Sequence, residues 1–264
     1  MKKLILLFLI IPELAFANDI STLAGKAISA ISTIAGKAKA DIATVGGGGV
    51  PAAAPAAFCD CSGDVTFCWE ITADNTTITS SGGCVDSGDS TATANSTPSI
   101  AAAATGKTGY AITWTTASDY YYFDVTSDDL ISDNAGTLEF DVYFTTLTNG
   151  MGLFHAGYDD NNRLYIYVFA DTDLRARYVG NTTAVNADTS GAALTTGAWY
   201  TVTMKWTQSD VDPNLSINVN SVTGTSTTNL TNFATASNVI RFGEIVGNAS
   251  GAQIKNIRIY NSWQ

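Results

Sequence analysis

The stretch 199–219 restricts most strongly what this chain can fold into. Between 199 and 206 apolar and polar residues alternate, so that Val202, Met204 and Trp206 fall on one face of an extended strand. A polar stretch then interrupts the pattern, and the alternation resumes at 215–219. Two alternating runs joined by a short polar turn predict a β-hairpin with one buried face and one polar face.

Short runs of the same kind recur along the chain after residue 58. They lie at 65–71, 110–114, 120–125, 136–144, 152–156, 163–169, 174–179, 199–206, 215–219, 239–242 and 254–260. Turn signals rich in glycine, asparagine and aspartate separate them. Eleven short strands predict an all-β fold in which two antiparallel sheets form a sandwich, as one domain over 58–264.

The first residues carry a targeting signal. Lys2 and Lys3 precede an apolar stretch, and the small residues Ala15 and Ala17 fit the cleavage rule, which makes 1–17 a signal peptide. A membrane anchor is the alternative, but the apolar stretch is far shorter than the ~20 residues needed to cross a bilayer. We therefore expect a secreted, extracellular or surface-associated protein without membrane insertion after cleavage.

An eleven-residue repeat occupies 18–45. Ala-Gly-Lys-Ala occurs at 24–27 and again at 35–38, and apolar residues step by three or four, which predicts one apolar stripe on a helix. Gly25 and Gly36 weaken such a helix by about 1 kcal/mol each. The segment is either a flexible stalk or a helix for docking and homo-oligomerisation. The stretch 46–57, rich in Gly, Pro and Ala, reads as a linker.

The charge balance excludes some partners. The chain carries 24 acidic and 13 basic residues, a net charge of −11. Long-range repulsion therefore opposes binding to nucleic acid and to anionic membranes.

Four cysteines lie close together in the sequence, at Cys59, Cys61, Cys68 and Cys84. An exported chain meets an oxidising compartment, so two disulfides are expected, with three ways of pairing them. A zinc site is the alternative, but the paired Cys-x2-Cys spacing and a nearby histidine are missing.

The order of motifs resembles a known superfamily. The motifs are 106–112 followed by Ser-Asp-Tyr-Tyr-Tyr-Phe at 118–123, Glu-Phe-Asp-Val-Tyr-Phe at 139–144, Trp-Tyr-Thr-Val-Thr-Met-Lys-Trp at 199–206 with 215–219, and Ile-Lys-Asn-Ile-Arg-Ile-Tyr at 254–260. Together they are similar to the laminin G-like, concanavalin A-like lectin/glucanase superfamily over 58–264. The resemblance implies a jelly-roll sandwich with a concave sheet, used for glycan binding, adhesion and, in some branches, polysaccharide cleavage. Fold alone does not choose among these.

The glucanase branch of that superfamily carries Glu-x-Asp-x-x-Glu on one strand. Glu139 and Asp141 match the first two acids, but Phe144 stands at the third position. A retaining glycosidase needs two carboxylates about 5 Å apart, one of them as the acid. We therefore expect no catalytic site here and interpret the two acids as solvent-facing strand residues.

The alginate-lyase branch uses a histidine and a tyrosine, often within Gln-Ile-His. This chain has Gln253-Ile-Lys255, and its single histidine, His155, stands among apolar strand residues. Such a histidine is more typical of a structural residue than of a catalytic base.

Two neighbouring runs carry the candidate ligand-binding residues. Arg163, Tyr165 and Tyr167 fall on one face of the first, and Arg175 and Arg177 on one face of the second. If the runs pair as a hairpin, tyrosine rings for stacking on sugars meet guanidinium groups that suit carboxylate or sulfate. The alternative is that these tyrosines are ordinary residues of an exposed sheet.

Calcium is the candidate cofactor. Asp210, Asp212 and Asn214 place oxygen ligands at alternate residues of one loop, and further Asp/Asn clusters stand at 159–162 and 171–173. Calcium takes six to eight oxygens, so each cluster supplies only part of a shell. The alternative is that these residues serve the turns in which Asp and Asn are common.

Three functions remain open. The favoured one is a secreted, non-catalytic carbohydrate-binding or adhesion module that binds a glycan or polysaccharide and is displayed through its N-terminal segment. The second is a structural or decoration protein of a particle or surface layer without a glycan ligand. The third is a polysaccharide-cleaving enzyme of the same fold.

Overall fold

The computed structural model describes residues 33–34, 37–38, 59, 64–71, 91–114, 116, 118–124, 131, 134–170, 172–209, 213–233, 239–243 and 251–264. The chain divides into two units, Met1–Ala57 and Phe58–Gln264. Of the first unit, two short antiparallel strands are described, β1 (Thr33–Ile34) and β2 (Lys37–Ala38). The repeat predicts a helix, but these four residues are extended. The signal peptide, the linker and the rest of 18–45 lie outside the described residues.

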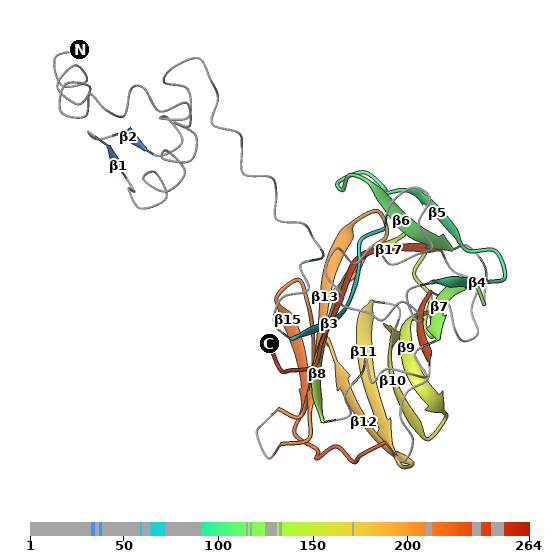
Figure 1. Ribbon diagram of the computed structural model, residues 1–264, viewed down its shortest axis with the longest axis vertical. Helices are drawn as coiled ribbons and strands as arrows, with labels where there is room; N and C mark the ends of the chain where they lie inside the picture. The colour runs from blue at the N-terminus through green and yellow to red at the C-terminus, as the bar shows by residue number, and fades with distance from the viewer. Residues whose placement is uncertain are drawn as a thin grey trace, which may run out of the picture. The chain divides into compact units, whose positions relative to one another are not determined.

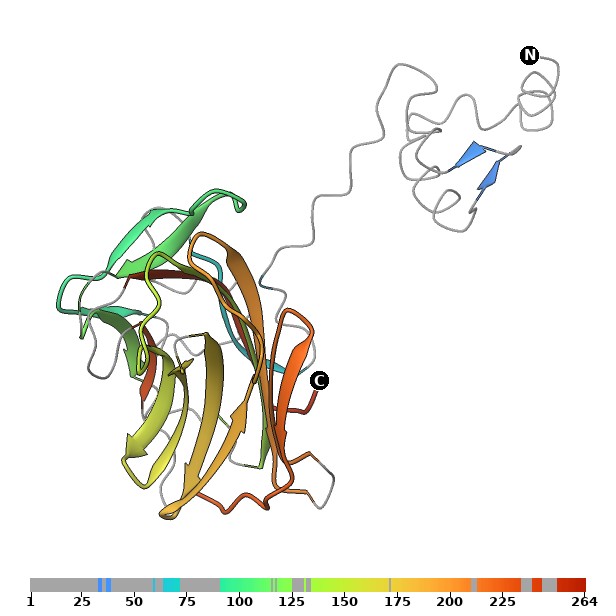
Figure 2. The ribbon, with the colours of Figure 1, turned by 180° about the vertical axis from the view of Figure 1, so that it is seen from behind.

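The described part of the second unit consists of two antiparallel sheets (Figures 1 and 2). Its strands are β3 (Val65–Trp69), β4 (Thr93–Asn95), β5 (Ser99–Ala102), β6 (Tyr110–Trp114), β7 (Tyr120–Asp124), β8 (Ala135–Phe144), β9 (Gly152–Asp159), β10 (Asn162–Phe169), β11 (Asp173–Gly180), β12 (Thr183–Asp188), β13 (Trp199–Thr207), β14 (Leu215–Val219), β15 (Val222–Ser226), β16 (Val239–Gly243) and β17 (Ala252–Tyr260). No helix that could cross a membrane occurs in this part of the chain.

One sheet has seven strands in the order β12-β11-β10-β9-β16-β7-β4. The other has eight, in the order β15-β14-β13-β8-β17-β6-β5, with β3 also paired to β17. The expected two-sheet antiparallel sandwich is confirmed, and each of the eleven predicted runs contains a strand. The expected hairpin at 199–219 is β13 paired with β14.

The core lies between the sheets because alternate residues of most strands are apolar. In β8, Leu138, Phe140, Val142 and Phe144 are buried. Trp206 of β13 is fully buried, and it fits because Gly136 on the paired strand has no side chain to occupy the space of the indole ring.

Aromatic rings from both sheets fill the centre of this core. Phe67 and Trp69 of β3 pack edge-to-face against Phe123 of β7, with ring centroids 5.1 and 4.9 Å apart. Phe242 of β16 stacks on Phe67 at 6.0 Å. Edge-to-face and offset pairs of this kind are the favoured aromatic geometries. These contacts therefore stabilise the packing of one sheet against the other.

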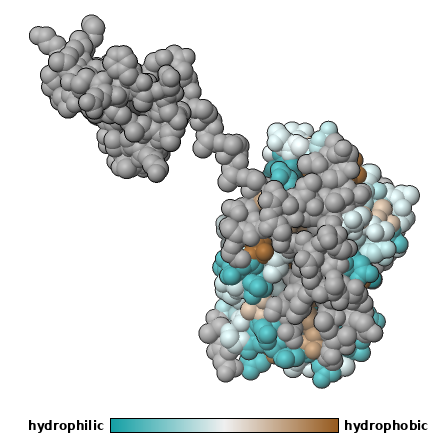
Figure 3. Space-filling model, viewed as in Figure 1, coloured by the Kyte–Doolittle hydropathy of each residue, from teal (hydrophilic) through white to brown (hydrophobic). Residues whose placement is uncertain are grey.

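On the face of the molecule drawn in Figure 3, the coloured residues are mainly hydrophilic and the hydrophobic areas are small and separate. Among the described residues, Tyr110 and Trp263 are the large hydrophobic side chains classed as exposed.

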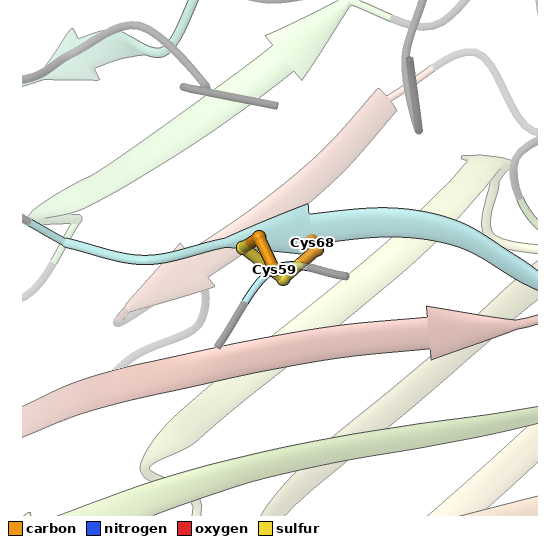
Figure 4. The surroundings of a disulfide bond; sticks show 2 residues. All are labelled: Cys59 and Cys68. Carbon is orange, nitrogen blue, oxygen red and sulfur yellow. A yellow bond between two sulfur atoms is a disulfide. The ribbon is translucent and has the colours of Figure 1, made fainter. Parts of the chain in front are cut away.

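A disulfide joins Cys59 to Cys68 of β3 (Figure 4), with 5.5 Å between their Cα atoms. Phe67 and Trp69 enter the core, so Cys68 between them faces away and can bond the preceding segment. The bond therefore anchors the start of the second unit to β3. Cys61 and Cys84 lie outside the described residues.

Candidate functional site

The outer face of the seven-stranded sheet gathers the five predicted ligand-binding residues. Leu164, Ile166 and Val168 of β10 are buried, so the residues between them point away from the core. β10 pairs with β11 as expected for a hairpin. The register places Tyr165 opposite Arg177 and Tyr167 opposite Arg175.

At the level of Tyr165 a single row of side chains crosses all seven strands, and we call it the transverse row. Its members, joined strand to strand by the register, are Asn186 of β12, Arg177 of β11, Tyr165 of β10, His155 of β9, Arg241 of β16, Tyr122 of β7 and Thr93 of β4. The row contains two arginines and no carboxylate. This is notable in a chain whose acidic residues outnumber its basic ones by 24 to 13.

Arg241 and His155 belong to the transverse row, but the sequence alone does not predict them as ligand-binding residues. Alternation at 239–243 indicates that Arg241 points away from the apolar Ile240 and Phe242, but it gives no sign of which strands lie beside it. His155, expected to be a structural residue, lies on the outer face between Tyr165 and Arg241.

Aromatic rings and guanidinium groups stack along this face. The rings of Tyr165 and Tyr167 are nearly parallel, with centroids 5.4 Å apart and 21° between their planes. The guanidinium of Arg163 lies 4.8 Å from the centre of the Tyr165 ring, and that of Arg177 lies 5.9 Å from it. Arg241 lies 5.4 Å from the ring of Tyr120. Such cation–π contacts hold the guanidinium groups in place.

The arginines differ in whether their charge is already paired. Arg175 forms a bidentate ion pair with Asp188, at 2.5 and 2.6 Å, and Arg163 pairs with Asp160 at 2.7 Å. By contrast, no carboxylate among the described residues pairs with Arg177 or Arg241. The predicted residues Arg175 and Arg177 are therefore not equivalent, because within the described part of the chain Arg177 forms no ion pair whereas Arg175 does.

Buried nitrogens without a hydrogen-bond partner also concentrate on this face. Within the described residues, six buried side-chain nitrogens have none, and four of them lie here. These four are His155 Nδ1 and the Nε atoms of Arg163, Arg177 and Arg241. Each such group costs about 1–3 kcal/mol while it stays unpaired, so this face holds a local excess of polar nitrogens over acceptors.

His155 is uncharged at neutral pH. Burial lowers the pKa of the imidazole to about 4, helped by the positive charges of Arg241 and Arg163 and opposed by Asp160. The neutral ring is therefore able to donate one hydrogen bond and accept another. Burial likewise raises the pKa of Tyr165, which keeps its hydroxyl protonated.

A pocket of about 230 Å³ opens between β9 and β10. Its lining includes Tyr165, Tyr167, Arg163 and His155. The register explains the hollow, because Gly152 stands opposite Tyr167 and has no side chain to fill the space beside the ring. The pocket thus combines stacked rings with hydrogen-bond donors, the composition of sites that hold small polar ligands.

The two acids of the glucanase-like pattern lie on the other sheet. Asp141 is only 5% exposed and accepts hydrogen bonds from Lys107 Nζ (3.0 Å), Thr201 Oγ1 (2.6 Å) and Asn256 Nδ2 (2.6 Å). It is therefore a buried acceptor rather than the solvent-facing residue that alternation predicts. Phe144, at the position of the third acid, is in the core.

Gln253 and Lys255 hold a loop over this second sheet. Gln253 Oε1 accepts a hydrogen bond from the Ala104 amide at 2.7 Å, and Lys255 Nζ donates to the Thr108 carbonyl. Trp199 Nε1 donates to the Ala104 carbonyl at 3.1 Å. The segment that matches part of the alginate-lyase signature thus makes structural contacts between β17 and the loop joining β5 to β6.

The predicted calcium ligands are only partly described, because Asp210 and Asp212 lie outside the described residues. Asn214 is buried, and its Nδ2 donates to the carbonyls of Thr207 (3.2 Å) and Ser209 (2.8 Å), which closes the turn. In the second cluster, Asp159 Oδ1 accepts a hydrogen bond from the Asn161 amide at 2.8 Å. Calcium binding at 210–214 remains a proposal.

Comparison with known protein families identifies the superfamily that has this fold. The profile of the concanavalin A-like lectin/glucanases superfamily matches residues 115–263, more than half of the chain. The chain belongs to this superfamily. No curated protein is significantly similar to it in sequence.

Solved structures share the fold at low sequence identity. The receptor binding domain of botulinum neurotoxin C/D mosaic serotype has a TM-score of 0.58 and 10% identity, over 76% of this chain and 48% of that chain. The binding domain of Paraclostridial Mosquitocidal Protein 1 has a TM-score of 0.59 and 12% identity, over 76% and 49%. This superfamily member therefore spans about half the length of these two domains.

Two further structural neighbours were solved in complexes. Domain 4 of AbnA, a GH43 extracellular arabinanase from Geobacillus stearothermophilus, in complex with arabinotriose, has a TM-score of 0.57 and 16% identity, over 75% of this chain and 93% of that chain. The binding domain of botulinum neurotoxin DC in complex with SialylT has a TM-score of 0.56 and 11% identity, over 79% and 50%.

Proposed function

We propose that this protein is a non-catalytic carbohydrate-binding module, and that the glycan lies on the outer face of the seven-stranded sheet. The pocket lined by the stacked rings of Tyr165 and Tyr167 and by His155 carries the proposal. Flat rings receive the apolar faces of sugars, while the imidazole and guanidinium groups beside them pair with hydroxyls. The neighbours solved with arabinotriose and with SialylT support a glycan ligand for this fold.

The contacts of Asp141 on the eight-stranded sheet support binding without cleavage. Asp141 already accepts three hydrogen bonds and has almost no exposed surface. A carboxylate so placed serves the structure and has no open side for a substrate. Release of reducing sugar from a bound glycan by the purified protein would contradict this part of the proposal.

A glycan array probed with the full chain tests the site. The Tyr165→Ala/Tyr167→Ala double variant removes both rings, each worth about 0.5–1.5 kcal/mol in stacking, so affinity falls roughly 5- to 150-fold. Tyr143→Ala is the matched control, because Tyr143 also packs against an aromatic neighbour, Trp199, with ring centroids 5.4 Å apart, but on the other sheet. Equal retention of the double variant and the wild type, or loss in the control alone, rules this face out.

We also propose that 1–17 directs export and that 18–45 attaches the module to a surface or to further copies of the chain. The basic and apolar residues of the first segment and the repeat of the second support this. N-terminal sequencing of exported protein should begin at Asn18. Light scattering should show fewer copies per assembly when 18–45 is deleted, and an unchanged number of copies would contradict attachment to further copies of the chain.

A further inference from the structure

We propose that the glycan held on this face is acidic, with a carboxylate or sulfate at Arg177 and a second one at Arg241. This inference rests on the proposed glycan-binding function and specifies the class of glycan. It starts from the transverse row, where two arginines flank Tyr165 and His155 and no acid interrupts them.

Among the described residues of this face, Arg177 and Arg241 are the cations without an ion-pair partner. Arg175 and Arg163 are neutralised by Asp188 and Asp160, whereas no described carboxylate pairs with Arg177 or Arg241. Their Nε atoms are buried and have no acceptor among the described residues. Anionic oxygens are the strongest acceptors for guanidinium groups, and arginine suits the planar geometry of carboxylate and the oxygens of sulfate.

The spacing of the arginines favours an oligosaccharide over a small anion. Arg177, Tyr165, His155 and Arg241 stand on four consecutive strands of the sheet. Three strand spacings separate the two arginines, about 14 Å between their Cα atoms. A glycan that crosses the strands therefore stacks on Tyr165 in the middle. Acidic groups on two separate sugar residues then reach Arg177 and Arg241.

His155 between the arginines contributes shape and hydrogen bonding rather than charge. Arg163 and Tyr165 face it from β10, Arg241 faces it from β16, and Asp160 lies in the adjoining turn. Its ring lies 6.3 Å from that of Tyr165, so the two form a continuous floor. Its Nδ1 atom is buried and has no hydrogen-bond partner among the described residues.

The test uses pairs of immobilised oligosaccharides that differ only in charge. Uronate-containing and sulfated oligosaccharides are each spotted beside their carboxyl-reduced or desulfated counterparts, with neutral oligosaccharides included, and the full chain is applied. We expect retention on the acidic members, at least about tenfold weaker retention on their neutral counterparts, and a loss on raising the salt concentration. Stronger retention on the uronate than on its carboxyl-reduced counterpart identifies a carboxylate as the ligand group. Stronger retention on the sulfated oligosaccharide than on its desulfated counterpart identifies a sulfate.

Arg177→Gln and Arg241→Gln should each weaken retention of the acidic oligosaccharides about tenfold while leaving the melting temperature unchanged. Lys205→Gln is the charge-matched control, because it removes one positive charge on the other sheet, where Lys205 contacts Trp263. Equal retention of acidic and neutral members overturns the acidic assignment and leaves the glycan-binding function standing. Absence of retention on every oligosaccharide overturns both, and an equal loss with Lys205→Gln shows that only overall charge matters.

Discussion

His155 gives a pH dependence that can be isolated cleanly, because it is the single histidine of the chain. In the unfolded chain the imidazole takes up a proton near its ordinary pKa of about 6.5. In the folded protein, burial and the charges of Arg241 and Arg163 lower that pKa to about 4. Between these values the unfolded state binds more protons, so the contribution of His155 to folding stability is fully present above pH 6.5 and declines as the pH falls toward 4.

The size of the effect follows from the two pKa values. From pH 7 to pH 5 the difference in proton binding lowers the free energy of unfolding by about 2 kcal/mol. Urea unfolding of the wild type and of His155→Gln at both pH values measures it, since the variant keeps a polar side chain that does not titrate. The variant should lose about 2 kcal/mol less than the wild type over this interval.

NMR measures the pKa of His155 directly, because a single histidine gives one imidazole signal that can be followed with pH. We expect its midpoint near 4. A midpoint near the ordinary value, or equal pH dependence of the wild type and His155→Gln, would refute the placement of the ring between two arginines in a desolvated site.

Three further predictions concern the scaffold. Gly136→Ala should lower the free energy of unfolding by about 1–3 kcal/mol, because a Cβ there overlaps the buried ring of Trp206, and an unchanged urea midpoint would show that the core can yield. A peptide map without reduction should link Cys61 to Cys84, the pair left over by the observed disulfide, whereas free thiols at both would argue against a second bond. If the loop 210–214 holds calcium, a chelator should lower the melting temperature, and an unmoved transition would exclude a stabilising calcium ion.

The sequence predicts the inner strands of both sheets and misses the outer ones. Within the second unit, the four strands without a predicted run are β4, β5, β12 and β15, which stand at the two ends of each sheet order. An edge strand has one strand neighbour and a smaller share of the core. Residues 93–95 and 99–102 accordingly contain no fully buried side chain, and Gly224 is the one buried residue of β15. In these three strands the apolar alternation is therefore too weak to predict a strand.

The candidate site shows a second limit of sequence reasoning. Arg163, Tyr165 and Tyr167 with Arg175 and Arg177 are close in sequence, and hairpin geometry suffices to bring them together. The other half of the transverse row depends on β16 inserting between β9 and β7, a long-range pairing that local patterns do not encode.

Asp141 shows why alternation alone does not define exposure. Its strand position faces outward, as predicted, but the loop between β5 and β6 and the bulge at Asn256 cover it. Asn256 has a positive φ of 54° within that bulge, which turns its amide toward the carboxylate. A motif match on this strand therefore records structural contacts rather than an open catalytic site.

The central claim is that the glycan binds across β11, β10, β9 and β16. Backbone amide shifts of the full chain, recorded with and without the oligosaccharide retained most strongly on the array, test it most directly. We predict that the largest changes occur at Arg177, Tyr165, His155 and Arg241. Changes confined to the outer face of the eight-stranded sheet, around Lys205 and Thr203, would contradict the account.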